Sequence, residues 1–134
     1  PVMAAGPPLA VEILDIGHDI GGGFGSFTAS GPAVDGGLVC PAGDVYDTHT
    51  NSSGPPGGTL RILNVDKLFV CDDFSGTFDI QMVVRLDTST GYTTANWIVT
   101  GGTGDYAGLH GKGKLDGTPG APGFIDDFYY GKMH

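Results

Sequence analysis

The sequence has few of the residues that favour helices and few cations. It contains one Glu, one Gln, four Lys and two Arg, against 10 Val and 12 Thr. Strong helix formers are therefore too scarce for long helices, whereas β-branched residues are plentiful. The net charge is −9, and no Lys or Arg precedes Arg61. We expect neither nucleic acid nor anionic lipid as a partner, because so acidic a surface would repel both.

Long apolar runs are also missing. No segment approaches the ~18 apolar residues that a membrane-spanning helix needs, so we expect no membrane span. Gly (25) and Pro (9) make up about a quarter of the 134 residues, but 40% are hydrophobic and alternate strongly with polar residues. This pattern favours a folded, turn-rich β protein. We predict a loose N-terminal segment over residues 1–8 and one domain over residues 9–134.

Apolar alternation and turn signals predict eight strands. The clearest is Thr77–Leu86, in which five apolar side chains share one face: Phe78, Ile80, Met82, Val84 and Leu86. The other expected strands are Leu9–Ile16, Phe24–Ser30, the two arms of a hairpin (Gly37–Asp47 and Thr59–Cys71), Tyr92–Thr100, Leu109–Leu115 and Phe124–Met133. Eight meandering strands close naturally into an antiparallel barrel, with an open two-sheet sandwich as the alternative.

The two cysteines, Cys40 and Cys71, flank a stretch that can only turn. That stretch is Asn51–Gly58, rich in Gly, Pro and Ser. If Gly37–Asp47 and Thr59–Cys71 are the arms of one hairpin, equal arm lengths place the cysteines opposite each other. We therefore predict a disulfide between them.

The same hairpin register would pair Asp44 with Lys67, a favourable cross-strand contact. A disulfide indicates an oxidising location, so we expect a secreted or periplasmic protein. The alternative is a cytosolic protein in which Cys40 and Cys71 are free thiols.

Motifs for common chemistries are absent or incomplete. Gly-x-Ser-x-Gly does not occur, so a hydrolase elbow has no support. Metal-ligand spacing is missing among the histidines, and we expect no metal site; the four are His18, His49, His110 and His134. Asp72-Asp73 and Asp126-Asp127 do not match a calcium loop, and we interpret them as solvated turn carboxylates. The glycine-rich Gly101–Gly104 lacks the Lys-Ser/Thr of a phosphate loop, so we expect a tight corner between strands.

One segment resembles a known family. Trp97–Gly111 reads Trp-Ile-Val-Thr-Gly-Gly-Thr-Gly-Asp-Tyr-Ala-Gly-Leu-His-Gly. It resembles the Val-Val-Gly-Gly-Thr-Gly-x-Phe-x-x-Ala-Arg-Gly segment of plant dirigent proteins and the Gly-Gly-Ser-Gly-x-Phe corner of allene oxide cyclases. Secreted bacterial proteins of uncharacterised role share this corner together with a cysteine pair. Phe24–Gly31 and Phe128–His134 are similar to the opening and closing strands of dirigent domains, and the order of elements extends the match over most of the chain.

The resemblance implies a small eight-stranded antiparallel barrel with an interior pocket. It also implies cofactor-free guidance of the cyclisation or isomerisation of a small apolar or amphipathic molecule. The expected assembly is a homo-oligomer, most often a trimer, with a dimer as the alternative.

Carried over residue by residue, the resemblance makes His110 the candidate catalytic residue. It stands where dirigent proteins have the Arg of Ala-Arg-Gly, an Arg that belongs to the polar set of their pocket. Imidazole titrates near neutral pH and can move a proton, which guanidinium cannot. The alternative is a solvent-facing His110, because Lys112 and Lys114 share its strand face. The paired Asp of dirigent first strands has no clear counterpart, which weighs against a phenoxy-radical or quinone-methide role.

Asn96 is the second catalytic candidate, because it is polar between the apolar residues Ala95 and Trp97. We expect the pocket to be lined by one Met and four aromatic residues, with core packing as the alternative. These are Tyr46, Met82, Tyr92, Trp97 and Tyr106. The structural corner is assigned to Gly101, Gly102 and Gly104.

Two functional hypotheses remain open. The first is an enzyme or guiding protein whose pocket fixes the conformation of a small apolar substrate during ring closure or isomerisation. The second is a non-catalytic extracellular module that binds a ligand or takes part in surface assembly. Barrels of this kind host many roles, so the fold alone does not choose between them.

Overall fold

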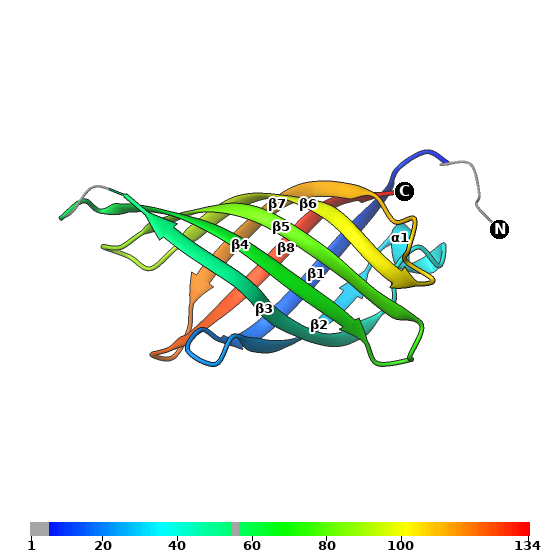
Figure 1. Ribbon diagram of the computed structural model, residues 1–134, viewed down its shortest axis with the longest axis horizontal. Helices are drawn as coiled ribbons and strands as arrows, with labels where there is room; N and C mark the ends of the chain where they lie inside the picture. The colour runs from blue at the N-terminus through cyan, green and yellow to red at the C-terminus, as the bar shows by residue number, and fades with distance from the viewer. Residues whose placement is uncertain (1–5, 55–56) are drawn as a thin grey trace.

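The computed structural model describes residues 6–54 and 57–134, which form a closed antiparallel β-barrel (Figure 1). Each strand pairs with the next in sequence, and β8 pairs with β1 to close the barrel. The strands are β1 (Leu9–Asp19), β2 (Phe24–Ser30), β3 (Ala42–Ser53), β4 (Leu60–Cys71), β5 (Gly76–Asp87), β6 (Thr93–Gly104), β7 (Gly111–Pro119) and β8 (Phe124–Met133). The predicted eight-stranded barrel is confirmed, and the sandwich alternative is wrong.

Helix contributes little to this fold. A single turn, α1 (Pro32–Asp35), lies between β2 and β3 at the end of the barrel that also holds the C-terminus (Figure 1). Its Ala33 is fully buried and joins the core. Within residues 6–54 and 57–134, no helix has the length and apolar character that crossing a membrane requires. Of the expected loose segment 1–8, residues 1–5 lie outside the described residues, and the next three are exposed.

The interior follows from strict alternation along the strands. On β5 the apolar face predicted from the sequence points inward, with Phe78, Ile80, Met82 and Val84 buried. At the α1 end, aromatic rings fill the barrel: Phe69 stacks on Phe78 with ring centroids 4.9 Å apart, and Phe27 packs edge-on against both.

Toward the opposite end, the aromatic side chains of the interior give way to charged side chains, and these in turn to an open cavity. Along the inward face of β4, Phe69 belongs to the aromatic core, Lys67 follows, and Val65 then lines a cavity. The inward face of β8 repeats this order with Tyr129, Asp127 and Ile125. Charged groups therefore separate the packed half of the barrel from the open half.

The predicted disulfide between Cys40 and Cys71 is present, with Cα atoms 6.0 Å apart, and it is buried. The predicted register is wrong by three residues, since Gly43 rather than Cys40 faces Cys71. The reason is that residues 31–41 form α1 and the connection from β2, so β3 begins only at Ala42.

Lys67 consequently pairs with Asp47 and not with Asp44, which faces Val70. The expected turn also shifts, because Asn51–Ser53 continue β3. Pro55 and Pro56, the midpoint of the predicted hairpin, lie outside the described residues.

Candidate functional site

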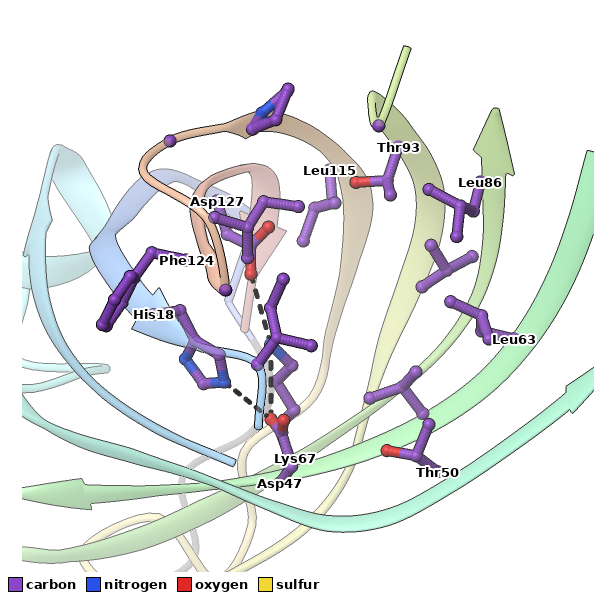
Figure 2. Close-up of a pocket in the computed structure, with 18 of the residues that line it drawn as sticks. His18, Asp47, Thr50, Leu63, Lys67, Leu86, Thr93, Leu115, Phe124 and Asp127 are labelled. Carbon is purple, nitrogen blue, oxygen red and sulfur yellow. Dashed lines mark hydrogen bonds and ion pairs between the residues drawn. The ribbon is translucent and has the colours of Figure 1, made fainter. Parts of the chain in front are cut away.

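A cavity of about 470 Å³ occupies the barrel end away from α1, beside the turn that joins β7 to β8. Figure 2 shows side chains that line it. Its wall is apolar and comes from β4, β5, β7 and β8: Leu63, Val65, Met82, Val84, Leu86, Leu115 and Ile125. The turn Pro119–Phe124 forms part of its rim, together with Thr50 and Gly91. The cavity has the size and lining that are typical of small-molecule sites.

The floor of the cavity is charged. Five residues form what we call the ionic cluster: Asp15, His18, Asp47, Lys67 and Asp127. All but Asp15 line the cavity, and Figure 2 shows their side chains directed toward one another. Asp15 and Tyr129 do not line the cavity. Asp15 Oδ1 and the Tyr129 hydroxyl oxygen are buried and have no hydrogen-bond partner among the described residues.

His18 connects two carboxylates. Its Nδ1 lies 2.6 Å from Asp15 Oδ2, and its Nε2 lies 3.0 Å from Asp47 Oδ1. Burial by itself would lower the pKa of His18, but the hydrogen bonds with Asp15 and Asp47 outweigh it and raise the pKa to about 9. The ring is therefore an imidazolium at neutral pH, with both nitrogens donating.

Lys67 is held in the same way. Its Nζ donates to Asp127 Oδ2 at 3.2 Å and lies 3.5 Å from Asp47 Oδ1. Burial by itself would lower its pKa, but electrostatic interactions with Tyr129, Asp127 and Asp47 raise it above the usual range. Lys67 thus remains an ammonium and is unsuited to act as an amine nucleophile, which requires the neutral form.

The two carboxylates that line the cavity differ in proton affinity. Burial raises the pKa of Asp127 above its usual value, despite the opposing effect of Lys67. Burial would also raise the pKa of Asp47, but the hydrogen bond from His18 and the charge of Lys67 lower it overall. Of the two, Asp127 is the better suited to hold and transfer a proton.

A bulge on β1 brings His18 into the cluster. Simple alternation would put Asp15 and His18 on opposite faces, since they are three residues apart. The pairing of β1 is interrupted between Asp15 and His18, where Gly17 adopts a φ of 70°. Both side chains then face inward, and the Gly17 N–H donates to Asp126 Oδ1 at 2.8 Å.

Two glycines provide the space for these side chains. A Cβ on Gly25 of β2 would contact Asp15 and lie 2.6 Å from His18 Nδ1. A Cβ on Gly117 of β7 would collide with the Thr93 hydroxyl and lie 3.0 Å from Asp127 Oδ1. The ionic cluster therefore depends on inward-facing positions that carry no side chain.

The structure does not bring the two catalytic candidates together or to the cavity. His110 is exposed at the α1 end, where its ring stacks on that of His134 at 5.5 Å. Asn96 is exposed on the outer face, and its Oδ1 accepts a hydrogen bond from Lys114 Nζ at 3.0 Å. Its apolar neighbours face inward while Asn96 faces out, as strand alternation requires.

Of the five residues expected to line the pocket, Met82 does so. Tyr46 lies on the outer face against Phe24, and Tyr92 is 55% exposed on the β5–β6 turn. Trp97 is buried in the core, where its Nε1 donates to the Lys114 carbonyl at 2.8 Å.

Tyr106 is buried at the α1 end, with its hydroxyl 2.6 Å from Ser75 Oγ. Gly101–Gly104, expected to form a tight corner between strands, are instead the last four residues of β6, paired with β5 at this same end of the barrel and away from the cavity. Gly104 has a φ of 58°, and a Cβ on Gly102 would collide with the Tyr106 carbonyl. Gly101 lies beside them, paired with Asp79.

Sequence reasoning missed the ionic cluster. The expectation that Asp127 is a solvated turn carboxylate is wrong, because Asp127 is 4% exposed and faces the barrel interior from β8. The alternation of side chains along a strand could have indicated this. Asp127 shares a strand face with Tyr129, and Lys67 shares one with Val65 and Phe69. Asp72 and Asp73, by contrast, are exposed as expected.

Within the part of the chain that the structure describes, no group of three or more His, Cys, Asp or Glu residues is arranged to hold a metal ion. Comparisons with protein-family models, with curated proteins and with solved structures found no match for this chain. The resemblance to dirigent proteins and allene oxide cyclases therefore stays a prediction.

Proposed function

We propose that this protein binds a small, mostly apolar molecule inside the barrel. The observation that carries the proposal is the cavity of about 470 Å³, with an apolar wall above a charged floor. Burying an apolar ligand against this wall supplies the main favourable free energy, and the few polar groups of the floor orient the ligand. The resemblance to dirigent proteins and allene oxide cyclases supports the same role.

A finer proposal is that the cavity guides a cyclisation or isomerisation of its ligand. A rigid wall can hold a flexible molecule in the geometry of ring closure, and this orientation alone lowers the barrier by several kcal/mol. Asp127 is the group that would transfer a proton, because it lines the cavity and its pKa is raised by burial. It takes the place that the sequence assigned to His110.

The second candidate is ligand binding without catalysis. It is favoured by the pairing of both cations of the floor with carboxylates. Each ring nitrogen of His18 is hydrogen-bonded to a carboxylate, and the Lys67 ammonium contacts two carboxylates. A floor whose two cations are both paired with carboxylates orients a ligand without reacting with it. Both candidates share the binding step.

The buried disulfide between Cys40 and Cys71 supports an extracytoplasmic location, because oxidising compartments preserve such bonds. The proposed homo-oligomer, a trimer or a dimer, rests on the resemblance alone. Light scattering on the purified chain measures its mass in solution and would contradict the assembly if the mass is that of a monomer.

The binding proposal can be tested with N-phenyl-1-naphthylamine, a neutral dye that fluoresces in apolar surroundings. Val84 lines the cavity and is 6% exposed, whereas its neighbour Val83 faces solvent and is 50% exposed. Val84→Trp should fill the cavity and abolish dye binding. Val83→Trp, the matched control, should bind like the unmodified protein.

Thermal unfolding and circular dichroism of both variants show whether the barrel is intact. Absence of dye binding to the unmodified protein would contradict the proposal. Equal dye binding by an intact Val84→Trp variant would do the same, because the dye would then lie elsewhere.

A further inference from the structure

Asp47 is the member of the ionic cluster that a ligand can reach. Its side chain is 19% exposed, whereas the side chains of Asp15, His18, Lys67 and Asp127 are each 7% exposed or less. Asp47 lines the cavity from β3, directly below the apolar wall. A polar group on a bound molecule would therefore meet this carboxylate first.

The two oxygens of Asp47 are used unequally. Oδ1 receives the hydrogen bond from His18 Nε2 at 3.0 Å and lies 3.5 Å from Lys67 Nζ. Oδ2 has no hydrogen-bond partner within residues 6–54 and 57–134. A Cβ on Gly23 would lie 3.6 Å from Oδ2, in van der Waals contact, so glycine at this position leaves that side of the oxygen open.

The charges around Asp47 favour a ligand whose polar group is a hydrogen-bond donor over one whose polar group is an acceptor. Three carboxylates in the cluster outnumber the two cations, and the N–H groups of His18 and Lys67 are already directed at carboxylates. The net charge of the whole chain, −9, attracts cations to the cavity and repels anions. An anionic ligand would have to displace Asp47 or Asp127 from these cations.

We propose that the ligand carries a hydrogen-bond donor as its polar group, best an alkylammonium, which binds Asp47 Oδ2 while the apolar part lies along the wall formed by β4 and β5. This inference rests on the proposed binding function and names the class of ligand for the same cavity. An ammonium offers three donors and no acceptor, so it complements a free carboxylate oxygen. The resulting hydrogen bond is charge-assisted and stronger than one between neutral groups.

The test is a displacement series on the unmodified protein. N-phenyl-1-naphthylamine is bound first and then displaced at neutral pH by decylamine, decanol or decanoate. Decylamine and decanoate are kept below their micelle concentrations, and decanol below its solubility limit. These compounds share one apolar chain and differ in the polar group. We expect decylamine to displace the dye at roughly tenfold lower concentration than decanoate, the ratio for one hydrogen bond to a charged group, with decanol between them.

Asp47→Asn removes the charge and keeps the size of the side chain. It should abolish the preference for decylamine over decanoate. Asp44→Asn is the matched control, because Asp44 lies on the same strand, outside the cavity, within 3.5 Å of Ser26 Oγ. This control should keep the preference, which excludes general attraction of amines to an acidic surface.

The outcomes separate the two proposals. If the dye binds in the cavity and decanoate competes as well as decylamine, the inference about the ligand class is wrong and the binding function stands. If the preference persists in a folded Asp47→Asn variant, Asp47 is not the recognition group. If the dye does not bind at all, the proposed function itself fails. Should Asp47→Asn not fold, the displacement series on the unmodified protein still decides the sign of the preference.

Discussion

The imidazole of His18 on β1 hydrogen-bonds to the carboxylate of Asp47 on β3, across the strand that lies between them. This contact is possible because the intervening strand β2 presents Gly25 to the interior. The Nε2–Oδ1 distance is 3.0 Å, and Lys67 approaches the same oxygen from β4. One carboxylate thus links three strands at the floor of the cavity.

Gly25→Ala should disrupt this link. The new Cβ would contact Asp15 and lie 2.6 Å from His18 Nδ1, so both side chains must move within a packed interior. We expect the free energy of unfolding to fall by about 1–3 kcal/mol, the usual cost of overpacking. Chemical denaturation measures it. Gly108→Ala is the control, because nothing lies within 4 Å of a Cβ there, and equal losses in the two variants would contradict the steric explanation.

The stability of the protein should depend on pH through His18. Its pKa is about 9 in the folded protein against 6.5 for the unperturbed side chain. A raised pKa stabilises the folded state fully below pH 6.5, and this contribution is lost as the pH rises through 9. We expect the free energy of unfolding to fall on the order of 2 kcal/mol across this window, after allowing for solvent screening.

Denaturation at a series of pH values, together with an NMR titration of the imidazole, checks this dependence. His18→Gln should flatten the profile between pH 6.5 and 9. An unchanged slope in that variant would show that another group is responsible.

Lys67→Met should destabilise the barrel strongly. Removing the ammonium leaves Asp47 and Asp127 without their shared cation in a buried site, which costs about 3 kcal/mol or more. Lys114→Met, on the outer face, should change the free energy of unfolding by less than ~0.5 kcal/mol. Thermal unfolding of both variants measures the contrast, and a Lys67→Met protein as stable as the control would show that the buried charges are not coupled.

The disulfide between Cys40 and Cys71 should stabilise the folded chain. The sequence separation is 31 residues, and on the chain-entropy account closing such a loop contributes about 3–4 kcal/mol. Replacing both cysteines by Ser should lower the free energy of unfolding by that amount. Mass spectrometry after alkylation provides the direct check, because two thiols that react without reductant would contradict the bond.

His110→Ala should leave both ligand binding and stability unchanged. The side chain is exposed at the α1 end, and its ring contacts that of His134 and no residue of the cavity. We expect a change of less than ~0.5 kcal/mol in the free energy of unfolding and unaltered dye affinity. Weaker dye binding in this variant would return His110 to the site that the sequence indicated.

The strands and the barrel could be predicted because they depend on local patterns. The inward face of β5, from Phe78 to Val84, is an unbroken alternation, and Gly-rich turns mark where strands end. Once eight such strands follow one another through short connections, closure satisfies every edge. Phe24–Ser30 and Phe124–Met133 even have the predicted bounds.

The candidate site could not be predicted in the same way, because it depends on register and on bulges. His18 faces inward only after the irregularity at Gly17, and Lys67 meets Asp47 only because β3 begins at Ala42. A shift of one residue turns a strand's side chains to its other face, and no local pattern specifies that shift. The amino-acid sequence by itself thus determined the number and approximate position of the strands, the barrel they form and which cysteines join. The tertiary structure alone decided that side chains from β1, β3, β4 and β8 meet as one charged floor.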